Sequence, residues 1–154
     1  MPRKTHEVEN HPHRGAVVAI LIEHGRRCHC VEALLDNGAT RSVLPYSAVE
    51  VLGLEGTLRR TRGIRGVGGR RLKAWRTKAQ LMAQIAILLD SEPKHIGPEV
   101  PLDPWFVKPP RRGFGSPPAA ERSLMGREDF LEFFDYSKAD GTFTLEWDEL
   151  DPPG

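Results

Sequence analysis

The residues Val31-Glu32-Ala33-Leu34-Leu35-Asp36-Asn37-Gly38-Ala39-Thr40 join an apolar, strand-forming run to a glycine turn. One carboxylate, that of Asp36, stands at the junction. Apolar flanks and a tight turn can hold such a carboxylate in the fixed geometry that general acid–base chemistry requires. The plain alternative is a β-hairpin with a solvated Asp36, because an Asn37-Gly38 pair between apolar runs is a strong hairpin signal.

Two further glycine segments follow along the chain. Ile64-Arg65-Gly66-Val67-Gly68-Gly69 is rich in glycine, and Leu124-Met125-Gly126-Arg127 again ends an apolar run with a glycine. The three segments, in this order, resemble those of the retropepsin-like aspartic proteases over most of residues 16–147. The resemblance implies a mainly β, closed, barrel-like acid-protease domain with a flap hairpin and one short helix, acting as a homodimer. The N-terminal Met favours a stand-alone cellular member of that family.

The resemblance also implies a role for each matched residue. Asp36 matches the catalytic aspartate, which would activate the water that hydrolyses an extended peptide. Gly126 and Arg127 match the glycine–arginine element that supports the active-site loop from below. The other matched positions form the active-site turn, Asn37, Gly38, Ala39 and Thr40, and the substrate-binding flap, Ile64, Gly66, Val67, Gly68 and Gly69.

Aspartic protease chemistry needs two carboxylates that share one proton, because like charges a few ångströms apart do not both ionise. This chain contains one Asp-x-Gly-Ala sequence. Asp90 follows an apolar run but precedes Ser91-Glu92 instead of a glycine turn, and Asp140-Gly141 lacks the apolar lead-in. The second carboxylate must then come from another copy of the chain, so a catalytic Asp36 implies a twofold homodimer.

Asn37 departs from the family pattern, which has Ser or Thr after the aspartate to link the two subunits beneath the dyad. An amide both donates and accepts hydrogen bonds, but its reach differs from that of a hydroxyl. A catalytically weak or inactive dimerisation or peptide-binding module on the same fold is therefore an alternative function.

Basic side chains are concentrated in one part of a chain whose formal net charge is only +1. Nine of the 22 Lys and Arg residues fall within residues 59–78, and residues 56–89 contain no acidic side chain. This segment suggests a second alternative, a nucleic-acid-binding β-domain, or a preference for acidic substrate peptides. Nucleic acid is disfavoured because only Trp75 supplies an aromatic ring nearby.

No cofactor or metal is expected. Cys28 and Cys30 flank His29, but on a strand His29 points away from both thiols, and no second ligand pair exists. A disulfide between strand neighbours two residues apart would be strained. Reduced thiols, no signal peptide and no membrane-spanning run together favour a cytoplasmic protein.

The 154 residues suit one domain. We expect a disordered tail over residues 1–14, the protease domain over 15–148 with a proline-rich inserted loop at 92–118, and a tail at 149–154. Eight of the 13 prolines lie in that loop, where they disfavour strand pairing and helix. The elements expected in the domain are strands at 16–23, 27–35, 40–45 and 141–147, a hairpin at 58–75, an apolar run at 77–89 that is either strand or helix, a helical turn at 47–52 capped by Ser47, and a helix at 127–134.

Overall fold

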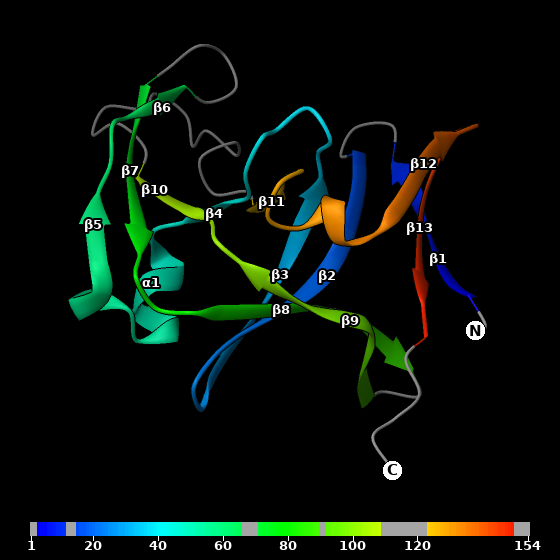
Figure 1. Cartoon of the computed structure of the whole chain (residues 1–154), viewed down its shortest axis with the longest axis horizontal. Coiled ribbons are helices and arrows are strands. Elements are labelled where there is room, and N and C mark those ends of the chain that lie inside the picture. The colour runs from blue at the N-terminus through cyan, green and yellow to red at the C-terminus, as the bar shows by residue number, and fades with distance from the viewer. Residues whose placement is uncertain (1–2, 12–14, 66–70, 90–91, 109–122, 150–154) are drawn as a thin grey trace.

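The computed structural model describes residues 3–11, 15–65, 71–89, 92–108 and 123–149, and within them it is mainly β (Figure 1). One α-helix, α1 (Ser47–Leu52), and two 3-10 helices, η1 (Glu55–Thr57) and η2 (Leu131–Phe133), interrupt the strands. The strands are β1 (Arg3–His11), β2 (Gly15–His24), β3 (Arg27–Leu35), β4 (Val43–Pro45), β5 (Leu58–Arg60), β6 (Ile64–Arg65), β7 (Arg71–Thr77), β8 (Leu81–Leu89), β9 (Glu92–Leu102), β10 (Trp105–Lys108), β11 (Ser123–Met125), β12 (Asp135–Ala139) and β13 (Thr142–Asp148).

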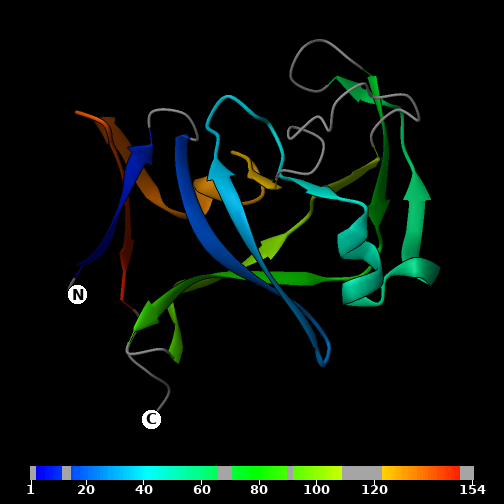
Figure 2. The same ribbon diagram turned by 180° about the vertical axis from the view of Figure 1, so that it is seen from behind.

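The hydrophobic core follows from the alternation of side chains along the strands. β2 buries every second residue, including Val18, Ile20 and Ile22. β3 does the same with its last residues, so that Leu35 faces the core and the next residue begins the turn. Figure 2 shows β2 and β3 as a long hairpin across the middle of the molecule, with α1, β5 and β7 at one end and β1, β12 and β13 at the other.

The sheet is not closed as a barrel, which corrects the expectation of a closed domain. Its strand order is β12-β13-β1-β2-β3-β11-β4-β10-β7-β5, and β8 leaves this path by pairing with β2 and β9. One edge of β2 is shared, because Ala16 pairs with β1 while Ile20 to Glu23 pair with β8. The sheet therefore forks at β2, and among the described residues no strand pairing joins the two branches into a closed barrel.

The strand β11 lies between β3 and β4, although it comes almost 80 residues later in the chain. Leu124 is opposite Leu34 of parallel β3 and Val43 of antiparallel β4. β3 and β4 are therefore not hairpin partners, and Asn37 has no positive φ. The plain hairpin alternative for residues 31–40 is wrong.

As far as residue 108 the proline-rich segment forms two strands, β9 and β10, separated by residues 103–104, instead of the predicted loop. β9 pairs only with β8 among the described residues, so it is an edge strand, where the missing N–H of proline is tolerated. Pro98 lies where the register between β8 and β9 shifts, and its neighbour Gly97 has a φ of +78°. β10 pairs with β4 and β7. Residues 109–118 of the predicted loop lie outside the described residues.

The N-terminal segment also forms a strand where a tail is predicted. Arg3 to Glu9 of β1 pair with β13 in a continuous antiparallel register, and Val8 is buried. The polar composition of this segment gave no sign of β1, because the strand is stabilised by pairing with β13, far along the chain. Residues 1–2 and 12–14 lie outside the described residues, as do 150–154 of the predicted C-terminal tail.

The predicted helices are confirmed at one position and corrected at the other. α1 spans the predicted residues and ends at Gly53, but Ser47 is its first residue and does not cap it. Residues 127–134 contain only the short η2, because Phe130 leaves helical geometry (φ −141°, ψ −65°) with its ring fully buried. Residues 81–89 of the apolar run 77–89 form the strand β8, and Thr77 ends β7.

Candidate active site

Asp36 begins a tight turn at the carboxyl end of β3. Its backbone N–H donates to Met125 O at 3.0 Å, which extends the β3–β11 ladder by one residue. Its carbonyl oxygen accepts from Ala39 N at 3.2 Å, and its side-chain Oδ1 accepts from Gly38 N at 3.0 Å. The half-buried carboxylate is thus fixed by the turn that it starts.

The segment after β11, residues 126–128, holds this turn through backbone hydrogen bonds. Arg127 N donates to Ala39 O at 2.9 Å, and Glu128 N donates to Thr40 O at 2.8 Å. Gly126 is buried against the Arg41 backbone, and a Cβ at this position would lie 2.7 Å from Arg41 O and overlap its carbonyl carbon. Only glycine permits this approach, so Gly126 fixes the distance between the two segments.

A buried serine and aspartate connect the same two segments through side chains. Gly126 N donates to Ser42 Oγ at 2.9 Å, and Ser42 Oγ donates to Asp129 Oδ1 at 2.9 Å. Asp129 Oδ1 also accepts from Ser42 N at 2.8 Å, and its Oδ2 accepts from Asp103 N at 3.2 Å. Burial raises the pKa of Asp129, although the hydrogen bonds from Ser42 and Asp103 oppose the shift.

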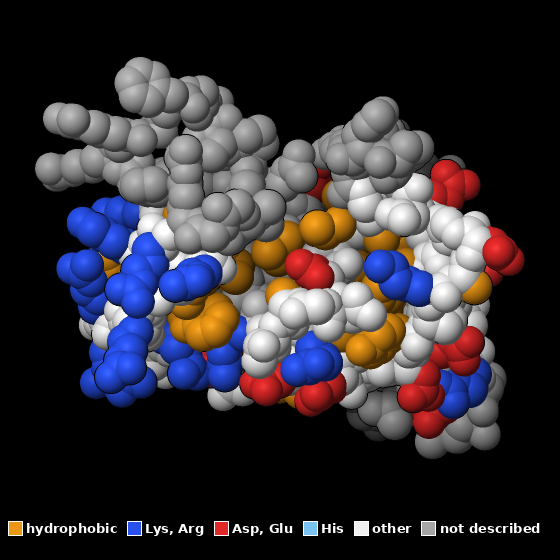
Figure 3. All heavy atoms as spheres, turned by 90° about the horizontal axis from the view of Figure 1, so that it is seen from above, with side chains coloured by type: hydrophobic (Ala, Val, Ile, Leu, Met, Phe, Trp, Pro, Cys, Tyr) orange, Lys and Arg blue, Asp and Glu red, His pale blue; other side chains and the backbone are white. Residues whose placement is uncertain are grey.

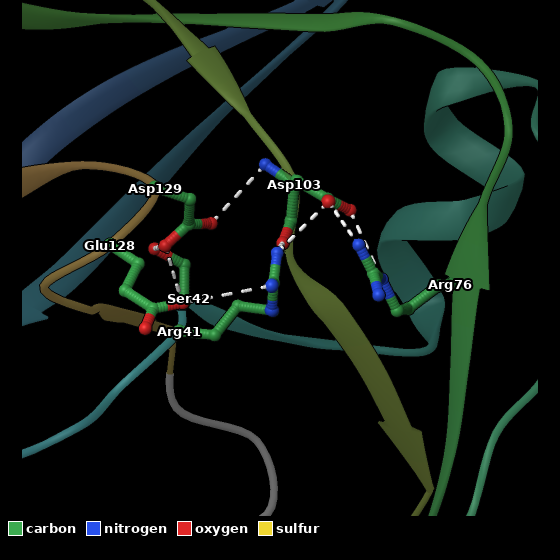
Figure 4. Close-up of polar contacts among 6 residues, drawn as sticks. All are labelled: Arg41, Ser42, Arg76, Asp103, Glu128 and Asp129. Atoms are coloured by element: carbon green, nitrogen blue, oxygen red, sulfur yellow. Dashed lines mark hydrogen bonds and ion pairs between the residues drawn. The ribbon is translucent and has the colours of Figure 1, made fainter.

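Asp103 extends this network toward β7. Figure 4 shows the Asp103 carboxylate between the guanidinium groups of Arg41 and Arg76. Arg41 Nη1 donates to Asp103 Oδ2 at 2.9 Å, and Arg76 pairs with the same carboxylate. Arg41 also lies 3.8 Å from a carboxylate oxygen of Glu128. The loop that carries Asp36 is thereby tied to strands that are distant in the sequence.

The predicted site residues are only partly brought together within the described residues. Asn37, Gly38 and Thr40 are exposed on the turn, and Arg127 contacts the turn through its backbone while its side chain is exposed. Ile64 is half-buried on β6, an arm of the predicted flap hairpin that pairs with β7. The remaining flap residues, Gly66, Val67, Gly68 and Gly69, lie outside the described residues.

The basic segment forms one end of the face seen in Figure 3, over β5, β6 and β7, and acidic side chains gather at the opposite end. Beside it, Lys108 Nζ at the end of β10 lies 4.0 Å from the Tyr46 ring centroid and 5.3 Å from that of Trp75. Arg60 lies 5.8 Å from the Trp75 centroid. Because these cations already contact both rings, the cluster does not favour stacking of nucleobases.

Two further observations concern metals and membranes. Cys28 and Cys30 are free, exposed thiols, and the described residues contain no cluster of three His, Cys, Asp or Glu side chains able to hold a metal ion. In the same part of the chain, no helix has the length and apolar content that crossing a bilayer requires.

No protein-family model matches this sequence, and no curated protein matches it. Among solved structures, a retropepsin-like aspartic protease from Rickettsia conorii is similar, with a TM-score of 0.52. The two chains share a fold. The match covers 95% of this chain and 93% of that chain at 13% sequence identity, a level at which the likeness concerns the fold alone. The mainly β fold with a likeness to a retropepsin-like protease is confirmed, the closed barrel is corrected, and the flap hairpin and the homodimer stay predictions.

Sequence reasoning missed the residues that support the Asp36 loop through side chains. Asp129 carried a usable signal, since it is an acidic residue directly before the apolar pair Phe130-Leu131 and three residues after Gly126. The ion pair of Arg76 with Asp103 carried none, because the two residues are 27 positions apart and each sits in an unremarkable polar context.

Proposed function

We propose that this protein is an aspartic endopeptidase that hydrolyses extended peptides at a dyad of two Asp36 carboxylates across a homodimer. The observation that carries the proposal is the Asp36 turn, held between β3 and β4 by the inserted β11 and its glycine. The turn fixes a half-buried carboxylate on a fold shared with a retropepsin-like aspartic protease.

The dimer is part of the proposal because one chain supplies one such turn. A lone carboxylate does not act as base and acid at once, whereas two that share a proton divide these roles. Asp36 from each protomer, related by a twofold axis, would form that pair. The exposed Asn37 and Gly38 beside it are then available for contacts with the second copy.

The chemistry follows from the two protonation states. The ionised Asp36 takes a proton from water, and the resulting hydroxide-like oxygen attacks the scissile carbonyl carbon. The protonated carboxyl of the partner's Asp36 donates its proton to the carbonyl oxygen, which gives a tetrahedral diol. Asp36, now protonated, then gives its proton to the amide nitrogen. The carbon–nitrogen bond breaks as one hydroxyl of the diol returns its proton to the partner's Asp36, so the products leave a dyad that again holds one proton. No covalent enzyme intermediate and no metal take part.

The test is cleavage of a diverse peptide library at several pH values between about 4 and 7. The wild type is compared with Asp36→Asn at several protein concentrations. We expect Asp36→Asn to abolish cleavage and the wild-type rate per chain to fall on dilution. Cleavage that survives in Asp36→Asn would refute the assignment.

A non-catalytic peptide-binding or dimerisation module is the second candidate function. The exposed Asn37 favours it, because the family's hydroxyl is replaced by an amide at that position. Dimerisation and peptide binding by a wild type that cleaves no peptide would support this candidate.

A further inference from the structure

The turn after β3 places an asparagine amide next to the backbone nitrogen of a glycine. Asn37 and Gly38 are both exposed, and the loop that carries them projects beyond the end of β3 (Figure 1). The hydrogen bond from Ala39 N to Asp36 O puts them at the two central positions of a β-turn. Asparagine is a thermolabile residue, because the next backbone nitrogen can attack its side-chain amide carbon. The turn therefore presents a reactive pair at an accessible position.

Glycine leaves the attacking nitrogen uncovered. A Cβ at position 38 would lie 3.3 Å from Asp36 Oδ1, a closer approach than most Cβ atoms make, and with Gly38 that space is open. A glycine also gives its backbone more freedom to rotate than any other residue. Gly38 N can therefore turn toward the side-chain Cγ of Asn37 without driving a side chain into Asp36.

The side chain of Asp36 is placed to act as the base for this attack. Gly38 N donates its hydrogen to Asp36 Oδ1 at 3.0 Å. The nitrogen must lose that hydrogen as it attacks, and a carboxylate that already accepts it can take the proton. The hydrogen bond that closes the turn, from Ala39 N to Asp36 O, is 3.2 Å long and lies at the weak end of the usual range. The turn can therefore open enough for the reaction while Asp36 keeps its hold on Gly38.

We propose that Asn37 is a self-modification site, which the chain converts to an acidic residue with Asp36 as the base. Gly38 N gives its proton to Asp36 and bonds to Asn37 Cγ. The bond between Cγ and the amide nitrogen breaks, and ammonia leaves with the proton that Asp36 had taken. The product is a cyclic imide that joins the two residues. Water then opens the imide at either carbonyl carbon, which gives aspartate or isoaspartate at position 37.

Either product changes the Asp36 loop. The new carboxylate stands one residue from Asp36, and like charges so close repel each other. Isoaspartate also lengthens the backbone of the turn by one methylene group, so the hydrogen bond from Ala39 N to Asp36 O cannot keep its geometry. The reaction needs only one chain, but its effect on pairing rests on the proposed homodimer. There each copy would bring an added charge to the dyad, and modified chains should pair more weakly.

Mass spectrometry follows the reaction without any peptide substrate. The protein is kept at mildly alkaline pH and sampled over time, and a zero-time sample corrects for conversion during digestion. Trypsin releases residues 28–41, in which Asn37 is the one side-chain amide, and residues 5–14, in which Asn10 is the one. Asn10 is the internal control, because it is also exposed but lies on β1 and precedes His11. We expect Asn37 to be converted at least about tenfold faster than Asn10.

Three variants assign the parts of the proposal. Asp36→Ser keeps an acceptor for the Gly38 N–H but removes the carboxylate, and it should slow the conversion about tenfold. Asn37→Asp copies one product, and it should raise the dimer dissociation constant about tenfold in sedimentation velocity. Gln80→Glu is the matched control, because it makes the same change from amide to acid at an exposed position between β7 and β8. It should leave the dissociation constant unchanged.

The possible results separate this inference from the proposed function. Conversion of Asn37 no faster than that of Asn10, in a wild type that cleaves peptides, would overturn the modification site and leave the protease proposal intact. Equal rates in the wild type and Asp36→Ser would overturn the role of Asp36 as the base. An unchanged dissociation constant in Asn37→Asp would overturn the effect on pairing. Rapid conversion of Asn37 in a wild type that neither pairs nor cleaves would support the modification site while the protease proposal fails.

Discussion

Gly126→Ala should cost the protein a large part of its stability, because no space exists for the added methyl group. The new Cβ would overlap the Arg41 carbonyl carbon and lie 2.7 Å from its oxygen, and both atoms belong to the backbone. The added methyl group would push the Gly126 and Arg41 segments apart, and such overpacking costs about 2 kcal/mol. It also strains the hydrogen bonds of Arg127 N to Ala39 O and of Gly126 N to Ser42 Oγ, at about 1 kcal/mol each. The sum is a loss of about 4 kcal/mol.

Urea denaturation of the wild type and of Gly126→Ala measures this loss directly. For a chain of this length the same change lowers Tm by about 10 °C. Gly56→Ala is the matched control, since its Cβ would meet nothing within 4 Å and its φ is not positive, so we expect a change within about 0.5 kcal/mol. A loss below about 1 kcal/mol for Gly126→Ala would show that the Asp36 loop is not held by this contact.

Three further substitutions test the network around Asp36. Ser42→Ala leaves the buried Gly126 N–H without its acceptor and should lower the free energy of unfolding by about 2 kcal/mol, and a urea-denaturation loss below about 0.5 kcal/mol would contradict this. Because burial raises the pKa of Asp129, its contribution to stability is fully present below the ordinary carboxyl pKa of about 4 and is lost as pH rises through the folded pKa. The wild type should therefore gain stability relative to Asp129→Asn as pH falls from about 7 to 4, and a relative loss in urea titrations would show that the hydrogen bonds outweigh burial. Asn37→Thr introduces the hydroxyl that the resemblance to retropepsin-like proteases implies at this position. If two copies pair as proposed, it should lower the dimer dissociation constant in sedimentation velocity, whereas a weaker dimer would show that Asn37 makes the better link.

The elements with strong local signals could be predicted from the sequence. The β2–β3 hairpin alternates apolar residues around His24-Gly25, and α1 ends at Gly53 as expected. The elements that were missed depend on partners far along the chain. β1 is a polar segment stabilised by β13, and β9 carries prolines that only an edge strand tolerates. Neither partner can be read from the segment itself.

The candidate site also contains residues that the sequence marks locally and residues that depend on distant partners. Asp36, Gly38 and Gly126 are set by backbone geometry, which leaves a clear mark in the sequence as an apolar run before a glycine. Ser42 and Asp129 act through a buried side-chain contact between positions 87 residues apart. The local sequence marks Asp129 as an acidic residue before an apolar pair, but it does not identify Ser42 as its partner. The open sheet was equally hidden, because it depends on β1 and β8 sharing one edge of β2.

The central claim is that two copies of Asp36 form one active site, and mixing wild type with Asp36→Asn tests it most directly. The two proteins are mixed at a fixed total concentration, well above the dimer dissociation constant. The cleavage rate is measured once their subunits have exchanged. If both carboxylates are needed, cleavage falls with the square of the wild-type fraction, to about one quarter in an equal mixture. A linear fall, to about one half in that mixture, would mean that each chain acts alone and would contradict the account.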